Sequence, residues 1–141
     1  MKKGRFFFLI LLIRGEMMRL LNDIVSDPEL GGVPFTILRD HMILRQGEAA
    51  LDFRETFPAF GAVQPAGDQD LALTPEEYRS ETLMIFYSPI PFSLGARPDA
   101  EHFTAPDRIA YDGRSFLVVA VRDWMAFGFS RAIATQKKEA P

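Results

Sequence analysis

Cysteine is absent from this chain of 141 residues, and histidine occurs only twice, as His41 and His102. Without cysteine there can be no disulfide, no thiol nucleophile and no thiolate metal site. The two histidines belong to no metal-binding spacing motif, so we interpret both as surface residues. The sequence also has no phosphate-binding loop, no nucleophile elbow and no dinucleotide-binding glycine pattern. We therefore expect neither catalysis nor a metal or other cofactor.

Long apolar runs are missing as well. The apolar stretch at residues 6–13 is eight residues long and is followed at once by Arg14, whereas a membrane span needs about 20 residues. No small-residue cleavage site of the kind that ends a signal peptide follows it. Three interpretations of residues 1–16 stay open: an extension upstream of a start at Met17 or Met18, an arm that is buried or binds a partner, and a targeting segment.

Positive charge is scarce beyond the N-terminus. The net charge is −3, and because the first sixteen residues carry +3, the remainder carries −6. Nucleic-acid affinity comes mainly from Lys and Arg side chains that neutralise phosphates, so an acidic domain is a poor candidate for wrapping DNA or RNA.

An acidic cluster precedes and enters a predicted helix. Thr74-Pro75-Glu76-Glu77 has the order of an N-cap, a first-turn proline and a capping glutamate, which predicts a helix of one or two turns. Acidic side chains near a helix start interact favourably with its dipole. Capping and solubility therefore explain the cluster without acid–base chemistry. Its members are Asp68, Asp70, Glu76 and Glu77.

Apolar periodicity predicts one helix followed by strands. Residues 17–25 carry the i, i+3, i+4, i+7 stripe of an amphipathic helix, and Gly31-Gly32 forms a flexible joint after it. From residue 33 to residue 135 we predict short strands, including 50–53, 57–63 and 81–87, with a turn at Gln46-Gly47. Pro58 marks an edge or a bulge. Residues 64–69 are interpreted as a loop, and residues 136–141 as a polar tail.

The C-terminal third predicts a meander. Asp112-Gly113 lies between two β-rich runs, and Asp-Gly is the pair that a two-residue type I′ hairpin turn prefers. An aromatic corner with Trp124 and Gly128 follows before a third strand. The predicted fold is mainly β: a small antiparallel β-barrel or sandwich with a short N-terminal helix and one long loop, at residues 88–104. Loops of this length in a compact domain are usually functional or mobile.

Several short segments, in order, resemble the neck proteins of tailed bacteriophages and prophages, the small head-closure, head–tail joining or collar proteins. They are Val63-Gln64-Pro65-Ala66, the acidic turn before Arg79, Asp107-Arg108-Ile109, Tyr111-Asp112-Gly113, Phe116-Leu117-Val118, Val121-Arg122-Asp123-Trp124 and Gly128-Phe129. The resemblance spans about residues 33–135, and residues 1–16 have no counterpart in it. The motif positions are Gln64, Pro65, Asp112, Gly113, Trp124 and Gly128.

The resemblance implies a structural and non-enzymatic role. Neck proteins form a homo-oligomeric ring between the portal or its adaptor and the tail proteins, and they close the filled head. The protein would then be found in the virion after assembly in the host cytoplasm, with no membrane partner. DNA would pass the ring without sequence-specific binding.

Two surfaces follow as hypotheses from that role. The loop at 88–104 carries apolar residues that should meet a neighbouring subunit or a portal-side partner, and the acidic cluster would repel DNA phosphates if it faces the channel. The candidate interface residues of the loop are Ile90, Phe92, Leu94, Arg97 and Phe103.

Three alternatives stay open. A tail-terminator or tail-completion protein of the same assembly is also a small ring-forming domain. A small-molecule-binding β-barrel would need convergent polar groups at its loop mouth, where only Arg97, Glu101 and His102 are available. A secreted or tethered bacterial protein rests on residues 6–13 alone.

Overall fold

A long antiparallel hairpin begins the described part of the chain. In the computed structural model, which describes residues 32–137, β1 (Val33–Arg45) pairs with β2 (Glu48–Gly61) over their whole lengths. Gln46 and Gly47 form the predicted turn, with φ of 54° and 80°. The separate strands predicted at 50–53 and 57–63 are wrong, because β2 is continuous through both. Pro58 is tolerated because β2 lies at the edge of the sheet, where a missing N–H disrupts no second ladder.

The predicted C-terminal meander is confirmed. It consists of β6 (Arg108–Tyr111), β7 (Arg114–Trp124) and β8 (Phe129–Lys137). Asp112 and Gly113 form the first turn with φ of 51° and 72°, the left-handed conformation that the Asp-Gly pair predicted. The short 3-10 helix η3 (Met125–Phe127) forms the second connection. The predicted tail at 136–141 begins too early, since Gln136 and Lys137 belong to β8.

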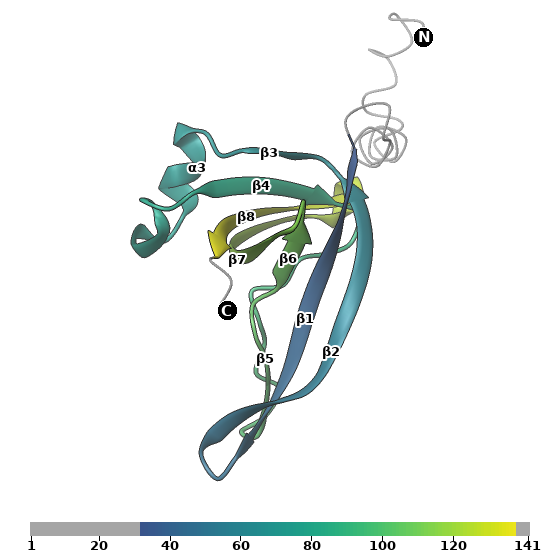
Figure 1. Cartoon of the computed structure of the whole chain (residues 1–141), viewed down its shortest axis with the longest axis vertical. Coiled ribbons are helices and arrows are strands. Elements are labelled where there is room, and N and C mark those ends of the chain that lie inside the picture. Colours follow the sequence, from purple (N-terminus) through teal and green to yellow (C-terminus); the bar gives the residue numbers. More distant parts are fainter. Residues whose placement is uncertain (1–31, 138–141) are drawn as a thin grey trace, which may run out of the picture.

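All strands form one antiparallel sheet. The hydrogen-bonded order is β2-β1-β6-β7-β8-β4-β3, and β5 (His102–Thr104) pairs with the distal part of β1. β4 (Leu83–Ser88) and β3 (Val63–Pro65) complete the other end. The predicted mainly β, antiparallel domain is confirmed, although the sheet is curled and open instead of closing as a barrel (Figure 1).

The two ends of this sheet are joined by a single residue. Ala62 lies between β2 and β3, and its carbonyl accepts a hydrogen bond from the Tyr87 N–H at 2.8 Å. A Cβ atom on Gly61 would lie 1.7 Å from the Tyr87 carbonyl oxygen, so only glycine fits here. This close approach bends the chain from the β1–β2 edge onto the far edge of the sheet.

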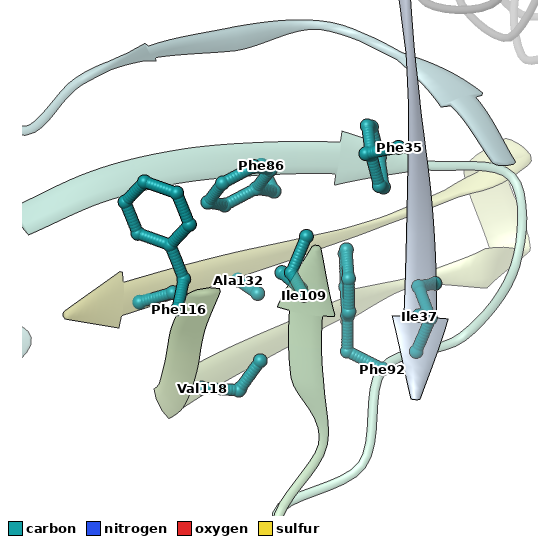
Figure 2. Close-up of a cluster of buried hydrophobic side chains, with 9 residues drawn as sticks. Phe35, Ile37, Phe86, Phe92, Ile109, Phe116, Val118 and Ala132 are labelled. Carbon is teal, nitrogen blue, oxygen red and sulfur yellow. The ribbon is translucent and has the colours of Figure 1, made fainter. Parts of the chain in front are cut away.

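The main core fills the concave side of the sheet. Figure 2 shows Phe35 and Ile37 of β1 facing Phe86 of β4, with Phe116 of β7 beyond it. The Phe86 ring meets the Phe35 and Phe116 rings edge-on, at centroid distances of 5.4 and 5.2 Å. Edge-to-face contacts of this kind add to the free energy of burial. The remaining buried members are Phe92, Ile109, Val118, Ala132 and Ala134.

A second, smaller core lies on the opposite face. The helix α3 (Asp68–Leu73) and the 3-10 helix η2 (Glu76–Tyr78) contribute Leu71 and Tyr78, which pack on this core. Its buried residues are Leu83, Ile85, Val119 and Ile133. β4 is apolar on both faces because it separates these two cores.

The helix prediction near residue 74 is wrong in position. Thr74 ends α3 instead of starting a helix, and its hydroxyl donates to the Asp70 carbonyl at 2.8 Å. Pro75 follows, and the residue before a proline is forced out of the α region. Residues 68–73, of which 68 and 69 were assigned to the loop, form the α-helix, and only η2 follows Pro75. The predicted helix at 17–25 and the extension at 1–16 lie outside the described residues.

Candidate interaction surfaces

The far half of the β1–β2 hairpin projects beyond the two cores. We call residues 40–54, with β5 alongside, the arm. Figure 1 shows the hairpin extending away from the rest of the sheet. β1 is 13 residues long, so at roughly 3.3 Å per residue the hairpin reaches about 40 Å from base to tip.

Apolar side chains are exposed on both faces of the arm. Leu51 is 50% exposed and Phe53 is 52% exposed. They face opposite sides because they pair with the consecutive residues Met42 and His41 of β1. The register shift at this point leaves Asp52 as an extra, bulged residue. The arm is therefore a ribbon that its own domain covers on neither face.

His41 anchors the Phe53 side of the arm. Its ring stacks on Phe53, with centroids 4.2 Å apart, and its Nε2 lies 2.5 Å from the Glu55 carboxylate. The Thr104 hydroxyl lies 3.4 Å from Nδ1. His41 is thus half-buried and not the surface histidine that was predicted, whereas His102 contacts Asp99 at the surface. Within residues 32–137 no three metal-ligating side chains form a cluster.

A buried ion pair fixes the base of the arm. Asp107 is fully buried, and its two carboxylate oxygens accept hydrogen bonds from Arg39 at 2.9 and 2.8 Å. The Ser93 N–H donates to the same carboxylate at 2.8 Å. These hydrogen bonds hold the pKa of Arg39 above its usual value. Arg39 also donates to the Pro91 carbonyl, so one side chain joins β1 to the long loop and to the residue that precedes β6.

The loop at 88–104 is more ordered than the sequence predicted. The sequence predicted one long loop here, but His102–Thr104 forms β5 on the arm, and Ala96 bridges Thr104. Ladder hydrogen bonds to β1 and the ion pair at Asp107 outweigh the turn-forming residues.

The candidate interface residues of the loop do not form one surface. Phe92 is buried in the main core and Ile90 packs against it. Phe103 pairs with Met42 on the arm, and Arg97 lies over its ring at 5.9 Å. Leu94 alone among the five is a half-exposed apolar side chain, at 49%.

The acidic cluster is also divided. Asp68, Glu76 and Glu77 are exposed on α3 and η2, as a channel-facing surface would require. Asp70 is buried instead, and it pairs with Arg131 and accepts the Gly67 N–H. Burial alone would raise the pKa of Asp70, but these two hydrogen bonds lower it below the usual value. Asp70 is therefore a structural carboxylate that closes α3 onto β8.

A second exposed surface lies on the α3 side of the sheet, beyond the helix. We call it the Arg–aromatic patch; it consists of Tyr87, Arg122, Trp124, Phe129 and Arg131. Arg122 and Arg131 lie directly opposite each other on β7 and β8. Trp124 is 37% exposed and its ring meets Phe127 edge-on at 5.6 Å. Beside the patch is a hollow of about 110 Å³, lined by Leu73, Ala120, Val121, Arg122, Arg131 and Ile133.

Sequence reasoning missed both surfaces. Two arginines of the meander pair with distant carboxylates, since Arg108 pairs with Asp40 and Arg131 pairs with Asp70, 68 and 61 positions away. The bulge at Val119 sets the register that brings Arg122 opposite Arg131, and no local residue pattern reveals it. For the arm, the long runs of β-forming residues before and after Gln46-Gly47 were a usable signal of a long hairpin.

The six motif residues lie in strands or at the turns between them. Gln64 and Pro65 lie in β3, where the Gln64 amide donates to the Tyr87 hydroxyl at 3.3 Å. Asp112 and Gly113 form the hairpin tip. Trp124 ends β7, and Gly128 follows η3 with a φ of 92°.

A scan against protein-family models finds no match for this chain, and a search of curated proteins finds no significantly similar sequence. Among the helices of the described region, none is long and apolar enough to cross a membrane.

Proposed function

We propose that this chain is a structural protein of a tailed-phage neck that forms a homo-oligomeric ring joining the head to the tail. The resemblance of residues 33–135 to such proteins suggests the class. In this role the chain would contact copies of itself, a portal or adaptor on the head side and tail proteins on the other, in the virion.

The arm is the observation that supports the proposal most. The ribbon protrudes and carries the half-exposed Leu51 and Phe53 on opposite faces. This exposure is unfavourable for a solitary domain, because apolar area left in water contributes nothing to the stability of the fold. When the ribbon lies between two subunits, the apolar side chains on both of its faces are removed from water. Structural rings need such inter-subunit elements, whereas a monomeric binding domain does not.

The surfaces found here favour assembly over small-molecule binding. Ligand pockets typically enclose about 300–1,000 Å³ and gather a few convergent polar groups. The hollow beside the Arg–aromatic patch has about 110 Å³. The polar groups of the loop do not converge either, since His102 bonds to Asp99 and Arg97 bonds to the Ala100 carbonyl.

Deleting the gene from the phage or prophage that carries it tests the proposal. Electron microscopy of the resulting lysate should show separate heads and tails instead of joined particles, and the protein supplied from a plasmid should restore joining. Tails of abnormal length on the deletion strain would instead indicate the tail-terminator alternative. Intact, infectious particles at normal yield would contradict both.

A further inference from the structure

The arm offers its faces for docking, not its edge. β2 is an edge strand with no partner on its outer side in the described structure, and such edges can pair with another chain. Here the bulge at Asp52 and the proline at position 58 interrupt that edge at two points. Bulges, charges and proline are the features that proteins use to prevent edge-to-edge pairing. The apolar faces around Leu51 and Phe53 remain for a partner.

The hollow beside the Arg–aromatic patch has the size of one apolar side chain. Its volume is about 110 Å³, and an apolar cavity of roughly 150 Å³ accommodates a benzene molecule. Leu73, which borders it, is 46% exposed. Aromatic residues and arginine are the side chains most enriched at the centres of protein interfaces.

The charges of the two surfaces are complementary. Arg122 is exposed and has no carboxylate within 4.0 Å among residues 32–137. It lies opposite Arg131, whose charge already pairs with Asp70, so Arg122 is the cation that an incoming carboxylate would neutralise. On the arm, Asp52 adjoins Leu51 and likewise has no cationic partner in the described region.

We propose that the arm of one copy docks on the Arg–aromatic patch of a second copy, with Leu51 entering the hollow and Asp52 facing Arg122. The donor and acceptor surfaces are different parts of the chain, so the contact is head-to-tail. Head-to-tail contacts generate a ring when the rotation between copies closes. The inference rests on the proposed function, because it names the contact that would build the ring.

Cysteine cross-linking tests the contact directly, since the chain has no native cysteine. The full-length variants Asp52→Cys and Arg122→Cys are mixed in equal amounts, one of them with a mass tag, and oxidised. A disulfide-linked mixed dimer should form. Arg114→Cys, an exposed arginine at the other end of β7, is the matched control and should not cross-link with Asp52→Cys. Equal cross-linking at position 114, or none at position 122, would overturn the proposal.

Self-association measured by analytical ultracentrifugation gives an independent test. Leu51→Ser should weaken association at least tenfold, as expected for an anchor in the centre of an interface. Leu94→Ser is the comparison, because Leu94 is exposed to the same extent, at 49% against 50%, but lies in the loop and not on the arm; it should weaken association much less than Leu51→Ser. Asp52→Arg and Arg122→Asp should each weaken association, and the two changes combined in one chain should restore it. Equal association of both leucine variants, or no restoration by the double change, would overturn the contact.

The outcomes separate this inference from the proposed function. If cross-linking and charge reversal succeed but the gene deletion leaves intact particles, the contact stands and the neck role fails. If the deletion abolishes joining while Leu51→Ser and Leu94→Ser associate equally, the neck role stands and the arm contact is wrong.

Discussion

Both halves of the β1–β2 hairpin carry apolar residues two positions apart, but in opposite surroundings. Near the base, Phe35 and Ile37 are buried in the main core at 4% and 0% exposure. Near the tip, Leu51 and Phe53 are half exposed. The same alternation of apolar residues thus predicts a strand correctly in both halves. It does not show whether other residues of the chain cover the apolar face of that strand. An apolar strand face without internal cover indicates an interaction surface.

The largest effect is expected in the main core. Phe86→Ala removes the ring that contacts Phe35 and Phe116 edge-on, and it should lower the free energy of unfolding by about 3–5 kcal/mol. Urea denaturation followed by circular dichroism measures this. Phe86→Leu, which keeps most of the volume, should recover much of the loss. A change below that of Phe53→Ala would contradict the division between core and arm.

A smaller but still large effect is expected where the two regions meet. Asp107→Asn removes the charge that pairs with Arg39 and should cost about 2–3 kcal/mol, because Arg39 is left largely buried without its counter-ion. Hydrogen exchange should show the Ser93 and Ala105 amides losing protection before that of Tyr87, whose N–H donates to the Ala62 carbonyl at the far edge of the sheet. Asp99→Asn, in the exposed part of the same loop, is the control and should change stability little. Uniform loss of protection across both cores would show that the ion pair does not act locally.

The acid sensitivity of the part of the domain outside the arm provides a third test. The pKa of Asp70 is lower in the folded protein than the roughly 3.9 of an unfolded chain. Its contribution to stability is therefore present above about pH 4 and is lost as the pH falls through the folded value. Asp70→Asn should flatten the decline of the urea midpoint between neutral pH and pH 3. Asp68→Asn, exposed on the same helix, should keep the decline of the natural chain; an equal flattening there would exclude the assigned role of Asp70.

The smallest effect is expected on the arm. Phe53→Ala should lower the free energy of unfolding of the monomer by less than about 1 kcal/mol, because the side chain is 52% exposed and its main contact is the His41 ring. Thermal unfolding at concentrations where the chain is monomeric measures this. A loss comparable to that of Phe86→Ala would mean that the arm unfolds cooperatively with the two cores.

Local chemistry explains which parts of the fold were predictable. The hairpin turns at Gln46-Gly47 and Asp112-Gly113 depend on residues that accept positive φ, so their positions follow from the sequence. The burial of Phe92 and the β5 ladder depend on Asp107 and Arg39, which are 68 positions apart, and no local pattern reports such a contact. Thr74-Pro75 was misassigned because the same residues can start a helix or end one, and only the packing of Leu71 on the second core decides between them.

For the candidate surfaces, the sequence indicated residue types but not their positions. Exposed apolar residues were expected in the loop at 88–104, yet the half-exposed Leu51 and Phe53 lie in the hairpin before it. The acidic cluster was identified, but the burial of Asp70 depends on Arg131, 61 positions away. Both outcomes depend on strand register, which a single sequence does not define.

The strand order also determines how quickly this chain reaches its native state. β1 cannot pair until β6 has been made, since their pairing and the Arg39–Asp107 bond join residues 68 to 74 positions apart. Closing so long a loop costs entropy before the contacts compensate for it, and all-β chains of this kind fold on the millisecond-to-second scale. The β6–β7–β8 meander contains only short-range pairings and should form first. Ile109 stays uncovered until β1 pairs with β6, so we expect the chain to be most prone to aggregation before the Asp107 junction forms.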